Sequence, residues 1–287
     1  MNNLVSKLLN NKMLVGYVFI LPWLVGFVIF TAFPIIYSLY LSFFDVVITT
    51  EGIQTKSAKL GNYEDAFTTD IQFLKEIGDF AVHIVISVPI IVILALIIAI
   101  LLNQPIKLRG FFRTVFFLPV IISSGPVLSK LTEQGVTAIP EMKEYAFYKI
   151  AEANSNYVSK LFLYLMDNMV LLLWFTGVQI LIFIAALQKV DKQIFEAAKI
   201  DGASTWEIFW KITLPSLFPM ILVNIIYTTV MYSISNMNPI IELIKKNMFK
   251  IETGFGYASA LSWVYFLVIT IILLAMVGSV RFLERKS

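Results

Sequence analysis

The feature that most constrains this chain is a succession of apolar runs, each long enough to cross a lipid bilayer. A hydrocarbon core of about 30 Å needs roughly 20 residues of α-helix. Hydrophobic residues make up 59% of the 287 residues and charged residues 14%, against about a quarter charged in soluble domains. We therefore predict an all-α, polytopic membrane protein with one transmembrane domain over residues 1–287. Its six predicted spans are residues 14–44, 78–102, 111–131, 161–187, 216–238 and 257–282, with residues 45–77 predicted as a polar loop and residues 239–256 as an outer loop.

Several classes of protein lack support in the sequence. There is no cysteine, so disulfides and thiolate chemistry are excluded. No glycine-rich phosphate loop, nucleophile elbow or metal-ligand cluster is present, which argues against an enzyme and predicts no cofactor or metal bound by this chain. The first apolar run is longer than a signal peptide and has no small-x-small cleavage site, so we interpret it as an uncleaved span.

One long segment, residues 189–219, does not span and carries helix signals at both ends. Asp191 is placed to cap a first helix. Gly202 follows that helix, where a residue free to adopt positive φ is needed. Ser204 and Glu207 have the spacing of a capping box for a second short helix, from Thr205 to about Lys211. The segment predicts a helix, a glycine elbow and a second helix, followed by the membrane. We interpret it as a docking element.

The same segment resembles the EAA loop of importer permeases that are powered by ATP-binding cassettes. The resemblance rests on Glu196-Ala197-Ala198, on Gly202 after three intervening residues, and on the I-x-L-P sequence ending at Pro215. Its small residues leave one surface shallow enough for a partner's groove to close on the helix. The resemblance implies that an ATPase is contacted through Glu196, Ala197, Ala198, Asp201, Gly202, Ala203, Leu214 and Pro215. An amphipathic connector between two spans is the alternative.

Two further stretches extend the resemblance to sugar permeases. LPWLVGFVIFTAFPIIYSLYLSFFD, residues 21–45, looks like the MalF-type half of a permease pair, and LRGFFRTVFFLPVIIS, residues 108–123, looks like the entry to the third span. The family implies a second, MalG-like permease subunit, a dimer of cytoplasmic ATPases that carry the ATP and Mg²⁺, and an extracytoplasmic solute-binding protein. Nothing in the sequence implies nucleic acid.

The distribution of basic residues predicts the orientation in the membrane. With the amino terminus inside, the inner segments hold twelve of the twenty-two Lys and Arg, in fewer residues than the outer segments. The turn containing Lys107, Arg109 and Arg113 is purely basic. Basic residues favour the cytoplasmic side. We therefore expect a multi-pass protein of the cytoplasmic membrane, with both termini and the EAA-like loop in the cytoplasm.

The fifth predicted span is unusually polar. Thr229, Tyr232, Ser233 and Asn236 stand at i, i+3, i+4 and i+7 and so share one helical face. Polar residues inside spans are costly and commonly face a cavity. Maltose-type permeases resemble this arrangement, so we predict a solute pathway that also includes residues of the fourth span: Trp174, Phe175 and Gln179, beside Thr176. The alternative is that these side chains only hold helices together.

Other polar residues near the span ends receive a less specific interpretation. Asp79 and the single histidine, His83, could form a proton relay or half of a metal site, but we favour interfacial polar residues. Asp167 and Asn168 could line an outer gate or meet a delivering protein, but we favour an interfacial pair.

Three functions therefore remain open at this point. The preferred one is the permease subunit of an ATP-driven, binding-protein-dependent sugar importer. The first alternative is a secondary transporter or channel that needs no ATPase, and the second is a membrane scaffold. The fifth-span face has hydroxyls, an amide and aromatic rings but no Arg or Lys, which favours a neutral glycan.

Overall fold

The computed structural model describes residues 12–49, 52–104, 110–111, 114–115, 144–154, 156–235, 237–250 and 253–285. The chain is mainly helical, as predicted, with one two-stranded sheet among these residues. Four described helices are long and apolar enough to cross a membrane, or five if one bent pair counts as a single span. The protein is a multi-pass membrane protein. The predicted third span, residues 111–131, lies almost wholly outside the described residues.

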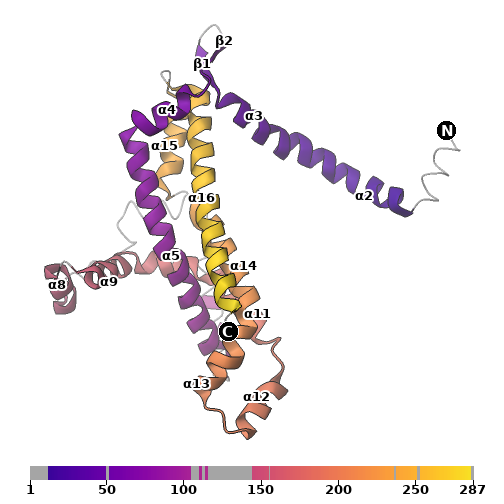
Figure 1. The fold of residues 1–287 in the computed structure, drawn as a ribbon, viewed down its shortest axis with the longest axis vertical. Coiled ribbons are helices and arrows are strands. Elements are labelled where there is room, and N and C mark those ends of the chain that lie inside the picture. Colours follow the sequence, from indigo (N-terminus) through magenta and orange to yellow (C-terminus); the bar gives the residue numbers. More distant parts are fainter. Residues whose placement is uncertain are drawn as a thin grey trace. The chain divides into compact units, whose positions relative to one another are not determined.

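The chain divides into two compact units, which Figure 1 labels by element. The first unit comprises Met1–Leu74 and Leu243–Tyr265. Its elements are α2 (Lys12–Phe27), a π-helical turn (Val28–Ala32), α3 (Phe33–Leu41), strands β1 (Phe44–Thr49) and β2 (Gly52–Ser57), α4 (Gly61–Thr68), the start of α5 (Ile71–Asn103), most of α15 (Pro239–Met248) and the first part of α16 (Gly254–Glu284).

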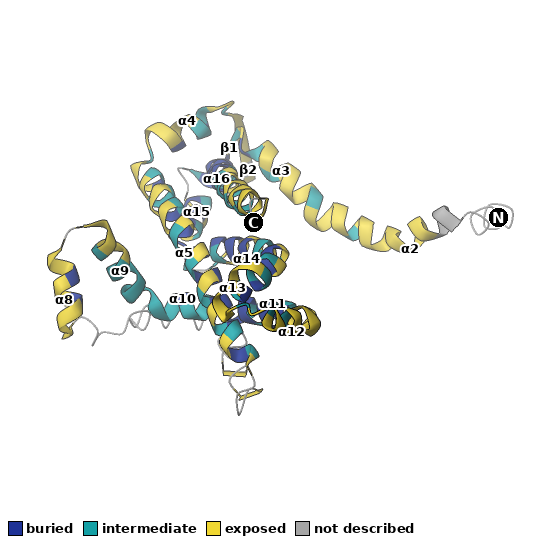
Figure 2. Ribbon diagram, turned by 60° about the horizontal axis from the view of Figure 1, so that its bottom comes forward, coloured by how far each residue is buried: buried dark blue, intermediate teal, exposed yellow. Residues whose placement is uncertain are grey.

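The first span is one helix, Gly16–Leu41, with no buried residue (Figure 2). Its two prolines do not break it. The π turn ends two residues before Pro34, and the Phe33 N–H donates to the carbonyl of Val28, five residues back. A proline ring in an α-helix collides with the carbonyl four residues earlier. The wider π turn relieves that collision, so the helix continues.

The region predicted as a polar loop, residues 45–77, is instead structured. β1 and β2 form an antiparallel hairpin in which Asp45 pairs with Lys56. Val and Ile dominate β1, and β-branched residues suit strands, a signal that the loop interpretation did not use. The Asn62 side chain fastens α4 to the hairpin by donating to the carbonyls of Ser42 and Phe44, at 3.0 and 3.1 Å.

The amino-terminal end of α16 packs against β1 within the same unit. A Cβ at Gly256 would overlap the carbonyl of Phe44, so only glycine permits this approach of two backbones. The Tyr257 hydroxyl donates to Asp70 Oδ2 at 2.9 Å, and Trp263 Nε1 donates to Ser38 Oγ at 3.2 Å. The two hydrogen bonds join residues 187 and 225 positions apart in sequence.

The second unit comprises Lys75–Glu242 and Phe266–Ser287. Its elements are the rest of α5 and α16 with α8 (Ala146–Ala153), α9 (Tyr157–Asp167), α10 (Met169–Phe175), α11 (Gly177–Leu187), α12 (Lys192–Ile200), α13 (Thr205–Ile208), a π turn (Phe209–Thr213) and α14 (Leu214–Ser233). The α5 core residues recur every three or four positions, which makes one buried helical face. They are Ile84, Val88, Ile91, Ala95 and Ala99.

The predicted fourth span, residues 161–187, is not a single helix. The chain bends by 67° between α9 and α10, at Asn168, and a second interruption at Thr176 separates α10 from α11. At both places the side chain bonds to a backbone carbonyl, Asn168 to Tyr164 and Thr176 to Leu173. Such bonds compete with the helical ladder. This local chemistry corrects the prediction of one straight span.

The second short helix predicted at 205–211 is not separate from the fifth span. α13, the π turn and α14 form one helix, Thr205–Ser233. The Leu214 N–H donates to the carbonyl of Phe209, so the π turn precedes Pro215 as the earlier one precedes Pro34. The helix also ends at Ser233, five residues before the predicted limit of 238.

The structure differs from the prediction in the last loop and agrees with it in the sixth helix. Residues 239–256, predicted as a loop, contain α15, whose first N–H groups are capped by Asn238 Oδ1 accepting from Ile240 N at 3.0 Å. Asparagine is among the preferred caps. The predicted span 257–282 is confirmed as a helix, α16, which is slightly longer at both ends.

Candidate functional site

The elbow between α12 and α13 is built from local hydrogen bonds. Asp191 Oδ1 accepts from Gln193 N at 2.9 Å and caps α12, as predicted. At the other end, Gly202 has φ of +82°. The Gly202 N–H donates to the carbonyl of Lys199 at 3.1 Å, and that of Ala203 to Ala198 at 2.9 Å. This is the pattern of a Schellman motif, which requires a left-handed residue after the helix.

The start of α13 closes the elbow with the predicted capping box. The Glu207 N–H donates to Ser204 Oγ at 3.3 Å, and the Ser204 N–H donates to Glu207 Oε2 at 3.0 Å. Two otherwise unpaired helix donors are thereby satisfied. Glu207 also pairs with Lys211 at 3.5 Å, on an exposed surface. The conformation of the elbow is therefore specified on both sides of Gly202.

The elbow is exposed along its length in this chain. No residue of α12 is buried, and Glu196, Ala197, Asp201 and Gly202 are exposed. The other predicted coupling residues are half-buried: Ala198, Ala203, Leu214 and Pro215. Two large apolar side chains also stand out, Ile200 at 86% and Trp206 at 69% exposure.

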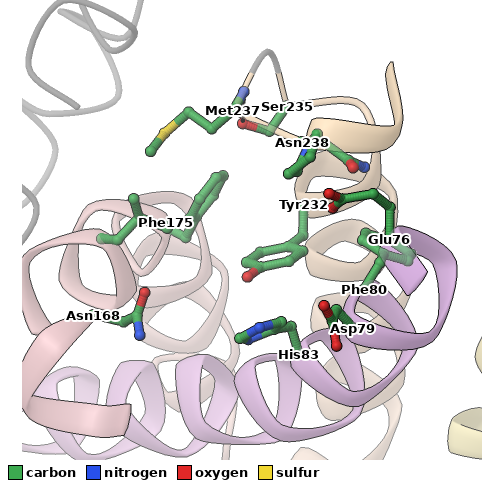
Figure 3. A pocket seen from close by; sticks show the side chains of 12 residues that line it. Glu76, Asp79, Phe80, His83, Asn168, Phe175, Tyr232, Ser235, Met237 and Asn238 are labelled. Atoms are coloured by element: carbon green, nitrogen blue, oxygen red, sulfur yellow. Dashed lines mark hydrogen bonds between the residues drawn. The ribbon is translucent and has the colours of Figure 1, made fainter. Parts of the chain in front are cut away.

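A cavity of about 350 Å³ lies at the opposite end of α14, within the second unit. Twelve residues line it (Figure 3): Glu76, Asp79, Phe80 and His83 of α5, Asn168 at the bend, Leu171 and Phe175 of α10, Tyr232 at the end of α14, and Ser235, Met237, Asn238 and Pro239 after it. This volume is in the range of small-molecule sites.

Aromatic rings form one wall of this cavity. The Tyr232 ring lies 5.5 Å from that of Phe175 and 6.4 Å from that of Phe80, measured between centroids. His83 lies 5.1 Å from Tyr164, whose hydroxyl is 2.6 Å from Ser87 Oγ. Tyrosine and asparagine groups beside the rings add donors and acceptors. A cavity that pairs ring faces with scattered polar groups suits a polyhydroxylated ligand.

A second set of polar side chains lies between α11 and α14. Gln179 Nε2 donates to Thr228 Oγ1 at 2.8 Å, and both residues are fully buried. Among the described residues, Gln179 Oε1, Trp174 Nε1 and both amide atoms of Asn224 are buried without a hydrogen-bond partner. Unpartnered buried polar groups are rare because each costs free energy. We name Gln179, Asn224 and Thr228 the buried polar cluster.

The structure distributes the predicted pathway residues over two places. Phe175 and Tyr232 line the cavity, whereas Gln179 belongs to the buried polar cluster and Trp174 does not line the cavity. Thr229 and Ser233 are buried, and Ser233 Oγ bonds to the carbonyl of Thr229 at 2.7 Å. Asn236 lies outside the described residues.

Sequence reasoning did not assign several cavity residues to this site. Glu76 was not singled out, and Asp79, His83 and Asn168 were interpreted mainly as interfacial. Glu76, Asp79 and His83 stand at i, i+3 and i+7 on α5, so their spacing alone predicts that they share one helical face. The sequence does not show that this face meets α10 and α14, because that contact depends on the 67° bend.

A comparison with family models finds one match. Residues 162–286 match the model described as binding-protein-dependent transport system inner membrane component. The matched range includes the elbow, the buried polar cluster and α14.

Two curated relatives are similar over most of their length. The chain is 28% identical to the lactose transport system permease protein LacF of Rhizobium radiobacter, over 94% of this chain and 95% of that protein. It is 31% identical to the arabinooligosaccharides transport system permease protein AraP of Halalkalibacterium halodurans, over 77% of this chain and 68% of that protein.

Among solved structures, a bacterial ABC transporter involved in the import of the acidic polysaccharide alginate has a chain with a similar fold. The TM-score is 0.62, with 19% identity and 99% of each chain covered. At that identity, the likeness concerns the fold.

Proposed function

This chain belongs to the family of inner membrane components of binding-protein-dependent transport systems, and we propose that it forms half of the translocation pathway of an ATP-driven importer for a sugar or oligosaccharide. It is a transport component, and ATP with Mg²⁺ would be bound and hydrolysed by a separate ATPase dimer. A second permease subunit and an extracytoplasmic solute-binding protein would complete the importer.

One observation carries this proposal: a single helix joins the exposed elbow to the cavity. Thr205, the first residue of α13, follows the Ser204 cap, and Tyr232 near the other end lines the cavity. The helix has 29 residues, which corresponds to a length of about 44 Å. That length exceeds the thickness of the hydrocarbon core. A displacement at the elbow is therefore delivered to the cavity on the opposite side of the membrane.

The sugar class is supported by the chemistry of the cavity and by the relatives. Rings such as Phe175 and Tyr232 offer flat apolar surfaces for a pyranose face, and Asn168 Oδ1 can accept a hydrogen bond from a hydroxyl. LacF and AraP are described as permeases for lactose and arabinooligosaccharides. Both points favour a carbohydrate.

The proposed orientation places both termini and the elbow in the cytoplasm, as the basic residues favour. α14 then runs outward, and α5 runs inward from the cavity, so the cavity opens to the exterior. The exposed Ile200 and Trp206 would enter a groove of the ATPase, with Glu196 as polar anchor. The unburied α2–α3 helix supplies an apolar surface for lipid and for the second permease subunit.

In the proposed mechanism, closure of the ATPase dimer moves α12 and the elbow together. The Schellman motif and the capping box fix the angle at Gly202, so the movement passes into α13. α14 then shifts Tyr232 relative to Phe175 and opens or closes the cavity. Asn224 and Thr228 of the buried polar cluster lie on the same helix between the two ends, and the unpartnered amide groups of the cluster would become hydrogen-bonded when the pathway opens around them.

The test is the ATPase activity of the complete complex in lipid vesicles. We expect a loaded solute-binding protein to stimulate hydrolysis several-fold, and replacing Gly202 with valine to abolish the stimulation while the complex still assembles. If no ATPase co-purifies and uptake follows an ion gradient, the chain is a secondary transporter. If partners bind but no solute moves, it is a scaffold.

A further inference from the structure

Two carboxylates face the proposed sugar cavity from α5. Glu76, Asp79 and Phe80 stand at i, i+3 and i+4, and all three line the cavity. Phe80 is buried and contacts the Tyr232 ring, which fixes this face of α5 toward the aromatic wall. Figure 3 shows Glu76 and Asp79 beside the Tyr232 ring. Their position is therefore set by packing.

The cavity contains no compensating positive charge among the described residues. Its charged lining consists of Glu76 and Asp79, while His83 is the only other titratable group apart from Tyr232. The ion pair found in the described part of the chain joins Glu207 to Lys211, on the elbow. Glu76 is half-buried and Asp79 is exposed, so neither carboxylate is sealed from solvent. The cavity thus carries a net negative field.

We propose that Glu76 and Asp79 act as an anion filter: the cavity accepts neutral sugars, and those bearing an amine, and rejects sugars that carry carboxylates. The inference rests on the proposed function and extends it to the substrate class. Carboxylate oxygens accept hydrogen bonds from sugar hydroxyls, so the same two groups bind a neutral ring. A uronic acid instead places a third negative charge within a few ångströms of them.

This assignment separates the chain from its structural neighbour. The alginate importer is described as moving an acidic polysaccharide, and a polyanion needs basic or neutral groups along its path. The cavity of this chain is instead lined by two acidic residues, Glu76 and Asp79. A shared fold therefore does not carry over the substrate.

The experiment measures sugar binding to the purified complex without the solute-binding protein, because that protein selects solutes on its own. The probes are gluco- and galacto-trisaccharides, each as the neutral sugar, the terminal uronic acid and the terminal amino sugar. Equilibrium dialysis gives the affinity of each. The filter predicts that the neutral form binds about tenfold more tightly than the uronic acid, and that this ratio falls as salt screens the charges.

The variant Glu76→Gln with Asp79→Asn keeps the shape and one hydrogen-bonding oxygen of each group, and replaces the other oxygen with an uncharged NH2 donor. It should bind the uronic acid about tenfold more tightly and change neutral binding by no more than about threefold. The matched control, Glu144→Gln with Glu152→Gln, removes the same charge from exposed residues that do not line the cavity and should leave the ratio unchanged.

The outcomes separate this inference from the proposed function. An unchanged ratio in the Glu76 and Asp79 variant, equal binding of both forms by the unaltered complex, or no binding of any probe overturns the filter. If the ratio responds as expected but no sugar stimulates ATPase activity, the filter stands and ATP-driven import fails. If ATPase stimulation by a neutral sugar is normal and the ratio does not respond, only the filter fails.

Discussion

The elbow and the cavity lie at the two ends of the helix Thr205–Ser233, and they differ in which interactions specify them. Every hydrogen bond that shapes the elbow joins residues no more than five positions apart, such as Ala203 to Ala198 and Ser204 to Glu207. The cavity draws on residues from Glu76 to Pro239. The first is specified by local backbone chemistry and the second by tertiary packing, so mutations should damage them differently.

The largest expected effect is at Gly202. The position has open space around it but a φ of +82°, so valine would be disfavoured by its backbone and not by a clash. We expect Gly202→Val to reduce transport at least tenfold without loss of assembly. Gly202→Asn is the matched control, because asparagine tolerates the left-handed region, and it should retain most activity. Uptake in vesicles at equal protein levels measures both. Equal losses in the two variants would contradict a conformational role for this residue.

A smaller effect is expected in the cavity, where a single wall residue contributes part of the binding. Tyr232→Ala removes the ring that lies 5.5 Å from Phe175 and should raise the KM for the transported sugar about tenfold. Tyr232→Phe keeps the ring and should change KM much less. Transport kinetics with saturating binding protein distinguish them. An alanine variant with normal KM would show that the sugar does not touch this wall.

A mutation in the buried polar cluster should change stability and transport in opposite directions. Both amide atoms of Asn224 are buried without partners in this state, so Asn224→Leu should stabilise the resting permease by about 1 kcal/mol. If the cluster becomes hydrogen-bonded when the pathway opens, the same variant should slow transport. Thermal unfolding in detergent and uptake in vesicles are measured together. Lower stability with normal transport would mean that the amide is structural.

The smallest effect is expected at the cap of α13. Ser204→Ala removes one half of the capping box and should destabilise the start of the helix by about 1 kcal/mol, reducing coupling about twofold. Ser204→Asp restores an acceptor and should recover it. ATPase stimulation reports the change. A loss larger than that of Gly202→Val would show that Ser204 itself contacts the ATPase.

The sequence was informative wherever structure follows from neighbouring residues. The cap at Asp191, the elbow at Gly202 and the capping box at Ser204 were predicted because each uses interactions within one or two helical turns. The hairpin at 44–57 had a readable signal in its Val and Ile residues, which was outweighed by the charges around it.

The remaining differences arise from effects that a linear pattern does not contain. The break at Asn168 and the continuity of α13 with α14 depend on side-chain-to-backbone bonds and on a π turn. The cavity depends on that break, because it brings Phe175 to Tyr232 and Asn168 near His83. Periodicity predicted the helical face that carries Tyr232, but it did not show which other residues of that face would be buried.

The central claim, that one rigid helix connects the elbow to the cavity, can be measured directly. The chain contains no cysteine, so Thr205→Cys with Ile234→Cys gives a doubly spin-labelled permease without background. The two positions stand about 44 Å apart along a helix. Pulsed electron paramagnetic resonance of the assembled complex should give the same narrow distance with and without ATP. A shift of more than about 5 Å on ATP binding, or two separate distances, would mean that the π turn acts as a hinge and would contradict rigid coupling.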